Sequence, residues 1–479
     1  MATMRIDVQD LESQRIIDRG FDAGQGHVFR FWSELDEAGR RALLAQLAEI
    51  DFALLRRLTD EFIRPGASPL AEKRLEPAEF IPVPRTPEQH RAADAAKQTG
   101  EQALRQGRVA AFLVAGGQGT RLGFDGPKGM YPISPVKNKT LFQLHAEKLL
   151  ALSRRHGATI PWYIMTSATN DAETRAFFEQ HDFFGLARED VVFFQQAMVP
   201  ALDENGKLFL DRKDHVFENP NGHGGSLAAL KQSGALQDMR DRGIDLIFYF
   251  QVDNVLVKIC DPVFLGFHLQ NEAEMSAKVV EKIDPSEKVG VVGRIDGELG
   301  VIEYSDLPEA EKRARNPDGS LKFRGGSIAI HVLDVAFVER ENEGGLRLPW
   351  HVAHKKIPHL DEQGNLVEPA EPNGYKFETF VFDALRDARR AMFLEVPREE
   401  EFSPVKNAEG VDSPSTARRD MVNLFASWLE KAGVTVPRNG DGTCKTPIEV
   451  SPLYALDAEE LRQKLPADLK LDGQPLYLG

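Results

Sequence analysis

Cysteine is scarce in this chain, which has only Cys260 and Cys444 among its 479 residues. Two cysteines so far apart cannot build a disulfide framework or a cysteine metal site. A run of about 18 apolar residues, long enough to cross a membrane, is also missing from the sequence. The N-terminal segment MATMRIDVQDLESQ is polar and acidic, unlike a signal peptide. We therefore expect a cytoplasmic protein with no membrane contact.

Positive charge is in short supply as well. Lys and Arg number 59 against 74 Asp and Glu, which gives a formal net charge of −15. Binding to nucleic acid needs a basic face that displaces counterions, so this balance excludes a general nucleic-acid binder. A ligand that carries phosphates must then be held by a local cluster of cations. With 42% hydrophobic and 28% charged residues, the composition is otherwise that of an ordinary globular chain.

Hydrophobic periodicity divides the chain into elements. It predicts helices within 10–62 and at 88–106, 140–155, 171–180, 226–242, 415–432 and 457–465, and strands at 109–115, 162–166, 190–195 and 246–252. The proline-rich stretch 64–87 is expected to be an extended linker. Strands and helices alternate through the middle of the chain, which predicts an α/β domain with a mainly parallel sheet. From 275 to 331 the strands come in pairs, with Asp296-Gly297 as a hairpin turn, so antiparallel strands are expected beside that sheet.

These elements suggest a division into three regions. We predict a helical N-terminal region at 1–107 that wraps the core, a central domain at 108–405 and a small C-terminal domain at 406–479. A chain of this length has room for one large domain and one or two smaller ones. The terminal regions could each support self-association, and their patterns fix no oligomeric state.

A glycine-rich turn is the most informative segment. An apolar strand runs directly into it, in Leu113-Val-Ala-Gly-Gly-Gln-Gly-Thr-Arg-Leu-Gly123. Its glycines let the backbone approach a ligand closely and leave amide groups to hold phosphate oxygens. Arg121 adds a planar guanidinium suited to phosphate, and Lys128 adds a second cation in the proline-stiffened Pro-Lys-Gly that follows. The segment 113–131 is therefore predicted to bind nucleotide phosphates.

Two rival glycine motifs fail at this turn. The dinucleotide fingerprint G-x-G-x-x-G, counted from Gly117, requires glycine where Leu122 stands, and Gly123 falls one residue late. The Walker pattern requires Gly-Lys-Ser or Gly-Lys-Thr, and neither triplet follows these glycines. A plain glycine turn would leave Thr120, Arg121 and Lys128 in register with the glycines unexplained.

The sequence resembles the UDP-sugar pyrophosphorylases, most closely their UDP-N-acetylglucosamine pyrophosphorylase branch. The stretches that carry the resemblance are GHVFRFWSEL (26–35), LVAGGQGTRLGFDGPKGMYPI (113–133), FFQQAMVPAL (193–202), NPNGHGGSLAAL (219–230), QVDNVLVK (251–258), AKVVEK (277–282), GVIEYSDL (300–307), NGYKFETFVFD (373–383) and EEEFSPVKNAEG (399–410). The resemblance implies a Rossmann-like, GT-A-like nucleotidyltransferase domain at 108–405. It also implies a reaction in which UTP and a sugar 1-phosphate, most closely N-acetylglucosamine 1-phosphate, give a UDP-sugar and pyrophosphate.

The resemblance implies roles for single residues. Arg121 and Lys128 are expected to hold the departing phosphates, and Lys406 to orient the attacking sugar phosphate. Asp253 ends the strand 246–252, where a carboxylate suits Mg²⁺ as well as a helix cap, and the resemblance favours the metal. The residues implied to bind the nucleotide are Ala115, Gly116, Gly117, Gly119, Thr120, Gln196, Gly222 and Lys376.

The sugar is expected to meet a second group of residues. They are His223, Glu303, Tyr304, Ser327, Phe380 and Phe382, although the alternating Phe380 and Phe382 are equally typical of core packing. The N-acetylhexosamine branch typically has asparagine where this chain has His223 and Ser327. Losing amides in a polar pocket can remove hydrogen bonds to an acetamido group. Glucose 1-phosphate, or a broad range of sugars, is therefore the alternative substrate.

Two other classes of protein fit the sequence less well. A non-catalytic sugar-nucleotide sensor would be expected to lack Arg121, Lys128 or Asp253, and all three are present. A nicotinamide-dependent oxidoreductase is disfavoured by the misplaced third glycine.

Overall fold

The computed structural model describes residues 6–64, 74–466 and 469–479. The chain divides into two compact units, each built from separate sequence segments. The smaller unit is formed by Met1–Glu72, Ala197–Gly225 and Leu348–Val381, and the larger by Lys73–Gln196, Ser226–Arg347 and Phe382–Gly479. The predicted boundaries at 107 and 405 stay a prediction, because they separate consecutive regions and these interleaved units do not test them.

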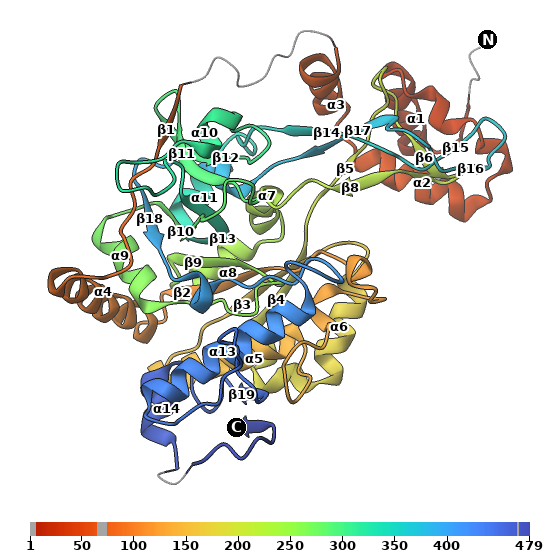
Figure 1. Cartoon of the computed structure of the whole chain (residues 1–479). Coiled ribbons are helices and arrows are strands. Elements are labelled where there is room, and N and C mark those ends of the chain that lie inside the picture. The colour runs from red at the N-terminus through yellow and green to blue at the C-terminus, as the bar shows by residue number, and fades with distance from the viewer. Residues whose placement is uncertain (1–5, 65–73, 467–468) are drawn as a thin grey trace. The chain divides into compact units, whose positions relative to one another are not determined.

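A ten-stranded sheet forms the centre of the larger unit (Figure 1). Four of its strands are β2 (Val109–Val114), β3 (Trp162–Thr166), β4 (Val191–Gln195) and β9 (Leu246–Gln251). They are parallel and lie in the order β9-β2-β3-β4. β2, β3 and β9 are buried along almost their whole length, as expected for strands covered on both faces. The predicted strands in this part of the chain are confirmed.

The rest of the sheet is mostly antiparallel. Its strands are β1 (Leu75–Pro77), β10 (Met275–Glu281), β11 (Val291–Ile295), β12 (Glu298–Ile302), β13 (Gly325–Asp334) and β18 (Ala391–Glu395). β13 pairs antiparallel with β9, β10 and β11, and so joins the two halves of the sheet. Asp296 and Gly297 connect β11 to β12 with φ values of 54° and 93°, the left-handed conformation that a two-residue hairpin turn requires. The predicted hairpin and the mixed α/β fold class are confirmed.

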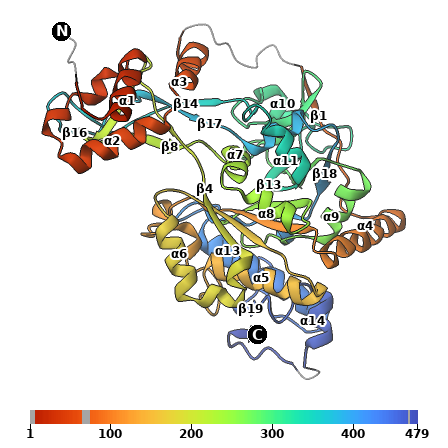
Figure 2. The same cartoon turned by 180° about the vertical axis from the view of Figure 1, so that it is seen from behind.

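The larger unit also contains helices. They are α4 (Pro87–Arg105), α5 (Leu141–His156), α6 (Asp171–Gln180), α8 (Ala235–Asp241), α9 (Pro262–Gln270), α10 (Glu309–Arg313), α11 (Val335–Glu341), α12 (Arg398–Glu401), α13 (Pro414–Lys431) and α14 (Ala458–Lys464). Figures 1 and 2 show α5 and α13 together on one side of the sheet, where both join one hydrophobic cluster with β2. The hydroxyl groups of Thr140 and Ser413 accept backbone N–H groups at the N-terminal ends of α5 and α13, which fixes where these helices begin. Beside α13 and α14, β19 (Ile448–Val450) and β20 (Leu476–Leu478) form a parallel pair.

The segment 226–242 is not the single helix that its periodicity predicted. It contains α7 (Gly225–Gln232) followed by α8. Gly234, between the two helices, has a φ of 79°, and a residue in the left-handed conformation ends one helix and redirects the chain. The hydrophobic pattern continues across the break, which explains why periodicity alone joined the two helices.

The smaller unit combines helices with pairs of short strands. The helices are α1 (Leu11–Asp22), α2 (Glu37–Glu49) and α3 (Phe52–Leu58), and the strand pairs are β5 (Met198–Pro200) with β8 (Glu218–Pro220), β6 (Leu210–Arg212) with β7 (His215–Val216), β14 (His351–Lys355) with β17 (Gly374–Glu378), and β15 (His359–Leu360) with β16 (Leu366–Val367). Phe29 and Trp32, within the stretch 10–62 predicted to contain helices, lie in two short 3-10 helices. Residues 65–73 of the predicted extended linker lie outside the described residues.

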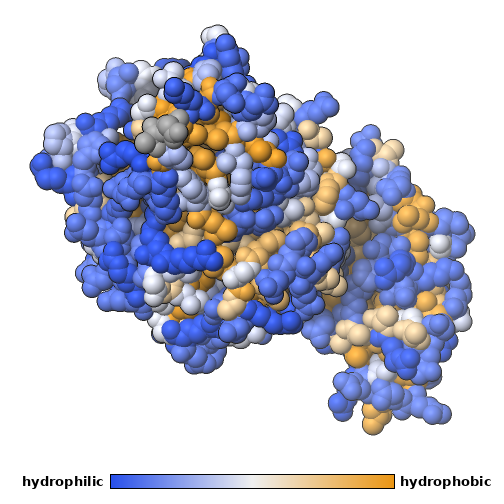
Figure 3. Space-filling view, turned by 90° about the horizontal axis from the view of Figure 1, so that it is seen from below, coloured by the Kyte–Doolittle hydropathy of each residue, from blue (hydrophilic) through white to orange (hydrophobic). Residues whose placement is uncertain are grey.

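The surface in Figure 3 is mainly hydrophilic, with hydrophobic residues in scattered groups. Within the described ranges, no helix has the length and apolar character needed to span a bilayer. Cys260 and Cys444 are both free thiols.

Candidate active site

The glycine-rich turn lies at the carboxyl edge of the parallel strands. Four neighbouring strands end there, and the segments that follow them carry the turn after β2, Asn170 after β3, Gln196 after β4 and Asp253 after β9. Parallel strands present their carboxyl ends at one edge of a sheet, so these groups belong to the same edge. This edge is where ligands bind in open α/β sheets.

Gly116 and Gln196 lie in direct contact at this edge. A Cβ atom at Gly116 would stand 2.7 Å from Nε2 of Gln196, so any other residue there would displace that amide. Gln196 is 8% exposed, and its backbone N–H donates to the carbonyl oxygen of Thr166 at the end of β3 (2.9 Å). The structure therefore brings the predicted base-reading glutamine onto the predicted nucleotide loop.

Asn170 holds the same loop from the other side. Its Nδ2 donates to the carbonyl oxygen of Ala115 (2.9 Å) and lies 3.4 Å from that of Gly117. The backbone N–H of Ser167 in turn donates to Asn170 Oδ1 (2.8 Å). Sequence reasoning missed Asn170, although a polar residue just after a buried strand, at the same edge as the glycines, was the signal that could have revealed it.

The loop then folds back so that Lys128 returns to the glycines. The backbone N–H of Gly119 donates to the carbonyl oxygen of Gly126 (2.9 Å), and that of Lys128 donates to the carbonyl oxygen of Gly117 (3.1 Å). A Cβ atom at Gly119 would stand 2.8 Å from the Phe124 ring, so this fold also requires glycine. Thr120 and Arg121 lie on the exposed side of the loop, in a short 3-10 helix at Thr120–Leu122.

Lys128 and Asp253 form an ion pair beside the loop. Nζ of Lys128 lies 3.4 Å from Oδ2 of Asp253, and the two side chains are only 17% and 10% exposed. β9 and β2 are neighbours in the sheet, which is why residues far apart in the sequence meet here. A cation and a carboxylate held together away from bulk water can bind a phosphate and its counter-ion.

Asp253 fits a magnesium ion that has few protein ligands. Among the described residues, no three His, Cys, Asp or Glu side chains are grouped so as to hold a metal ion. Mg²⁺ commonly uses one or two carboxylates and takes its other oxygens from water and substrate phosphates. The donor set at this edge, one buried carboxylate beside the predicted phosphate-binding loop, suits that mode and does not suit a structural metal site.

Lys406 is tied to Asp253 through the backbone. The N–H of Val405 donates to the carbonyl oxygen of Asp253 (2.9 Å), so Lys406 follows directly from this contact. Its side chain is 45% exposed, with Nζ 4.0 Å from Oδ2 of Asp412. The predicted catalytic lysine and the predicted metal ligand are thus brought together.

Gly222 and His223 pack on the backbone around Phe380 in the smaller unit. Gly222 has a φ of 82°, and a Cβ atom there would stand 2.3 Å from the carbonyl oxygen of Thr379. The backbone N–H of Val381 donates to Nδ1 of His223 (3.2 Å), and the His223 ring stacks on Phe380 with centroids 5.2 Å apart. Burial, reinforced by His351, lowers the pKa of His223 to about 4. A neutral imidazole whose Nδ1 accepts carries its proton on Nε2.

Lys376 also lies in the smaller unit, on β17. Its Nζ lies 5.0 Å from the centre of the Phe217 ring. Burial lowers the pKa of Lys376, and Lys355 adds to that effect while Glu378 opposes it. Lys376 is therefore not an ordinary solvated lysine.

The other residues predicted to meet the sugar belong to the larger unit. The backbone N–H of Ser327, on β13, donates to the carbonyl oxygen of Gly290 (2.8 Å), and a Cβ atom at Gly290 would stand 3.4 Å from Oε1 of Glu303. Ser327 and Glu303 are therefore brought together around Gly290. Tyr304 is 42% exposed and Phe382 is buried in a short helical segment, which keeps core packing as the competing interpretation of Phe382.

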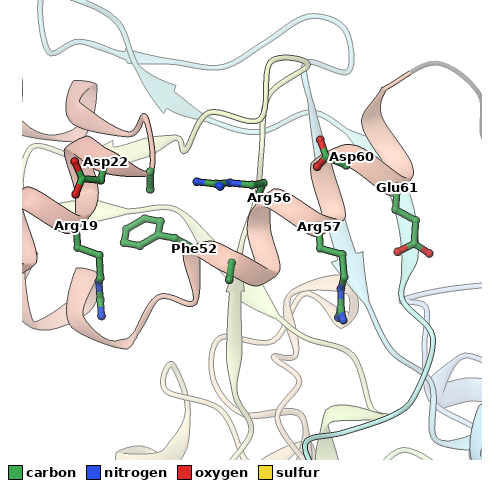
Figure 4. A pocket seen from close by; sticks show the side chains of 9 residues that line it. Arg19, Asp22, Phe52, Arg56, Arg57, Asp60 and Glu61 are labelled. Carbon is green, nitrogen blue, oxygen red and sulfur yellow. The ribbon is translucent and has the colours of Figure 1, made fainter.

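A separate cavity of about 690 Å³ lies between α1 and α3 in the smaller unit (Figure 4). It is lined by Arg19, Arg56 and Arg57 together with Asp22, Asp60 and Glu61, and by no candidate residue. Arg19 already donates to the carbonyl oxygens of Leu47 and Ala48. Because carboxylates balance the arginines, this cavity does not suit a triphosphate.

The fold and the residues at the sheet edge together define a class of site. A glycine-rich loop, a lysine and a buried carboxylate at the carboxyl edge of a parallel sheet have the geometry of an α/β nucleotide site.

Comparisons with known proteins identify the family. The family model UDPGP, described as UTP–glucose-1-phosphate uridylyltransferase, matches residues 69–423. UDP-N-acetylhexosamine pyrophosphorylase-like protein 1 of Xenopus tropicalis is 42% identical over 95% of this chain and 94% of its own length. UDP-N-acetylglucosamine pyrophosphorylase of Saccharomyces cerevisiae is 38% identical over 92% of this chain and 95% of its own. The crystal structure of the Trypanosoma brucei uridine diphosphate N-acetylglucosamine pyrophosphorylase with an inhibitor matches with a TM-score of 0.83 and 29% identity over 99% of both chains.

The chain belongs to the UDPGP family of UDP-sugar pyrophosphorylases. It is a nucleotidyltransferase, and the resemblance found in the sequence is confirmed.

Proposed function

We propose that this enzyme transfers the uridylyl group of UTP to N-acetylglucosamine 1-phosphate, giving UDP-N-acetylglucosamine and pyrophosphate. The observation that carries the proposal is the meeting of Lys128 with Gly117 and with Asp253 at the edge of the parallel sheet. The choice of sugar is supported by relatives whose names specify N-acetylhexosamine or N-acetylglucosamine.

The nucleotide end follows from the loop. Gln196 would read the uracil edge, because its amide both donates and accepts, together with backbone groups at Ala115–Gly117 and at Gly222. The Thr120 amide would hold a phosphate oxygen, while the Gly119 amide shapes the loop through its bond to the carbonyl oxygen of Gly126. Lys376 would contact the UTP as a second, partly desolvated cation.

The reaction is a direct displacement. An oxygen of the sugar phosphate attacks the α-phosphorus of UTP in line, the bond from that phosphorus to the bridging oxygen breaks, and pyrophosphate leaves with the electron pair. Arg121 and Lys128 would neutralise the departing phosphates, and Lys406 would orient the attacking phosphate. No covalent enzyme intermediate is required, so catalysis is positioning plus charge stabilisation.

Asp253 would hold Mg²⁺ through a carboxylate oxygen. The ion would supply charge neutralisation at the phosphate oxygens when it is bound. Asp253 would have to release Lys128 to do so, and that lysine would then turn to the phosphates.

The sugar end is assigned to His223, Glu303, Tyr304, Ser327, Phe380 and Phe382. A neutral His223 with its proton on Nε2 can donate one hydrogen bond to a sugar oxygen, whereas an asparagine could both donate and accept. We propose that this difference sets how strongly the enzyme distinguishes an acetamido group from a hydroxyl group.

One assay tests the proposal. Purified enzyme is incubated with UTP and Mg²⁺, separately with the 1-phosphates of N-acetylglucosamine, N-acetylgalactosamine, glucose and galactose, and pyrophosphate release is measured. The highest kcat/KM is expected for N-acetylglucosamine 1-phosphate. A higher kcat/KM for glucose 1-phosphate would show that this alternative substrate is the preferred one. No turnover of any sugar 1-phosphate would refute the proposed reaction. EDTA should abolish turnover, and added Mg²⁺ should restore it. Full activity in EDTA would refute the proposed requirement for Mg²⁺.

A cytoplasmic location is proposed on the two free thiols, Cys260 and Cys444, which suit a reducing compartment. Fractionation of cells that express the tagged protein would test it, and recovery of the protein outside the cytoplasmic fraction would contradict it.

A further inference from the structure

Two loops of the larger unit run side by side next to the candidate active site. One follows β9 and contains Asp253, and the other follows α12 and leads to Lys406. The N–H of Val405 donates to the carbonyl oxygen of Asp253 (2.9 Å), and the N–H of Val255 donates to that of Ser403 (3.3 Å). The backbone alone therefore brings the loops together over a short length.

Asn254 adds a side-chain clamp between these loops. Its Nδ2 donates to the carbonyl oxygen of Glu401 (2.8 Å), while the N–H groups of Ser403 and Leu256 donate to its Oδ1 (3.0 and 3.3 Å). Asn254 is 3% exposed, so water cannot replace these bonds without opening the site. The side-chain amide of Asn254 thus joins the backbones of the two loops.

Glu401, at one end of the clamp, is itself held in place by a buried lysine. The carboxylate of Glu401 pairs with Nζ of Lys278 (2.8 Å), whose side chain is fully buried on β10. Asp261 accepts from the same lysine (2.7 Å). The Lys406 loop is thereby fixed to the sheet at Glu401 and to the Asp253 loop through Asn254.

The side chain of Lys406 has little else to place it. It is 45% exposed, and among the described residues its Nζ has the Asp412 carboxylate at 4.0 Å and the Phe402 ring at 5.6 Å. Its position is therefore set mainly by its backbone. That backbone is held on one side by the clamp and the Val405 bond to Asp253, and on the other by the bond from the Lys406 N–H to the carbonyl oxygen of Asp412 (2.7 Å).

We propose that Asn254 is a positioning residue that fixes Lys406 at the right distance from Asp253 for the attack of the sugar phosphate. This inference rests on the proposed function, because Lys406 and Asp253 take their roles from it. Asn254 touches neither substrate nor metal and acts through the loop that carries Lys406.

Aspartate at this position would break one bond of the clamp and keep its shape. Asn254→Asp has nearly the same volume, and its Oδ1 can still accept from Ser403 and Leu256. The second oxygen faces the carbonyl oxygen of Glu401, where two acceptors repel each other instead of bonding. Asn342→Asp is the matched control, because Asn342 is also buried in the larger unit and its Nδ2 donates to the carbonyl oxygens of Leu227 (2.9 Å) and Val338 (2.8 Å).

The kinetic test compares wild type, Asn254→Asp, Lys406→Ala, the double variant and Asn342→Asp with both substrates varied. We expect Asn254→Asp to raise KM for the sugar 1-phosphate and lower kcat, together by about 30-fold in kcat/KM, with KM for UTP within about 2-fold of wild type. In the Lys406→Ala background the same change should cost less than about 3-fold, because the residue through which it acts is gone. Asn342→Asp should keep wild-type kinetics.

A second readout needs no turnover. Amide hydrogen exchange should speed up about tenfold or more across 401–412 in Asn254→Asp and stay unchanged there in Asn342→Asp. If Asn254→Asp does not fold, Asn254→Ser removes the same donor without burying a charge and is judged by the same criteria.

The inference would be overturned if the loss of kcat/KM in the double variant equalled the product of the losses in the two single variants. It would also be overturned if Asn254→Asp raised KM for UTP as much as KM for the sugar 1-phosphate. Either result would leave the proposed function standing. Wild-type kinetics in Asn254→Asp would likewise overturn the inference and leave the proposed function standing. An active wild type with an unimpaired Lys406→Ala would instead refute the proposed role of Lys406, and the inference with it.

Discussion

At the scale of single residues, the glycine loop works because Gly116 has no side chain. Gln196 covers it, with Nε2 2.7 Å from where a Cβ atom would stand. A methyl group there must displace the amide that is proposed to read the base. Gly116 therefore matters for the position of Gln196 as much as for the backbone.

Gly116→Ala tests this contact. We expect the Kd for UTP, measured by calorimetry, to rise about tenfold, which corresponds to roughly 1.4 kcal/mol. Because the collision is with Gln196, the same change should cost less than about 2-fold in a Gln196→Ala background. Equal losses in both backgrounds would show that the methyl group acts elsewhere.

His223 gives a second prediction at this scale. His223→Asn restores an amide that can both donate and accept, so the ratio of kcat/KM for N-acetylglucosamine 1-phosphate over glucose 1-phosphate should rise about 5-fold or more. The pKa of His223 is about 4, so the ring is neutral above pH 5 and the ratio in the wild type should not change between pH 6 and 8. A ratio that His223→Asn leaves unchanged would remove His223 from the sugar site.

At the scale of elements, α5 braces the loop that carries Asp253. Nε2 of His145 donates to the carbonyl oxygen of Val252 (3.0 Å), and Nζ of Lys148 donates to those of Val255 (2.8 Å) and Val257 (3.0 Å). His145 is fully buried, and burial, reinforced by Lys148, lowers its pKa to about 3.

This brace makes stability depend on pH. The pKa of His145 is lower in the folded protein than in the unfolded chain, so below pH 6.5 the unfolded chain binds the proton first. The free energy of unfolding should fall on acidification from pH 6.5 towards 3, by about 1.4 kcal/mol per pH unit from this group once the pH is well below 6.5. Urea unfolding of wild type and His145→Gln at pH 6.5, 5.5 and 5.0 measures the difference in slope. Parallel slopes would contradict a neutral buried His145.

The break between α7 and α8 gives a prediction about backbone conformation. Gly234 has a φ of 79° and open space around its missing Cβ atom. Gly234→Ala should therefore lower the free energy of unfolding by about 1 kcal/mol through backbone strain alone. Gly300→Ala is the control, because Gly300 lies on β12 at negative φ with its nearest neighbour 4.0 Å away. A loss as large in Gly300→Ala would refute the explanation.

The comparison of sequence and structure also belongs at this scale. The parallel strands and the loop at 113–131 were predicted because they are continuous in the sequence and their periodicity is local. The helix break at Gly234 was missed because glycine permits a left-handed conformation without requiring one. Asn170 and Asn254 were missed because their partners are carbonyl oxygens brought near by the sheet, and a single sequence does not reveal such contacts.

At the scale of the whole molecule, an acidic protein of net charge −15 keeps a few cations where the ligand is proposed to bind. The proposed cations of the larger unit are Arg121, Lys128 and Lys406, carried by separate segments of the chain. Lys128 is held by an ion pair with the buried carboxylate of Asp253. The local group of cations that the composition calls for is therefore proposed to form by folding, which brings Lys128 and the Lys406 loop to Asp253, and not from a basic stretch of sequence.

The most direct measurement is the turnover of UTP with N-acetylglucosamine 1-phosphate by Arg121→Ala and Lys128→Ala, each compared with Lys137→Ala. Lys137 is an exposed lysine a few residues after Lys128 that contacts the Tyr477 ring, so it controls for the loss of a charge from the same region. We predict that kcat falls about 100- to 1000-fold in Arg121→Ala and Lys128→Ala, with circular dichroism unchanged, and stays near wild type in Lys137→Ala. Near-normal turnover in both Arg121→Ala and Lys128→Ala would show that uridylyl transfer does not take place on this loop.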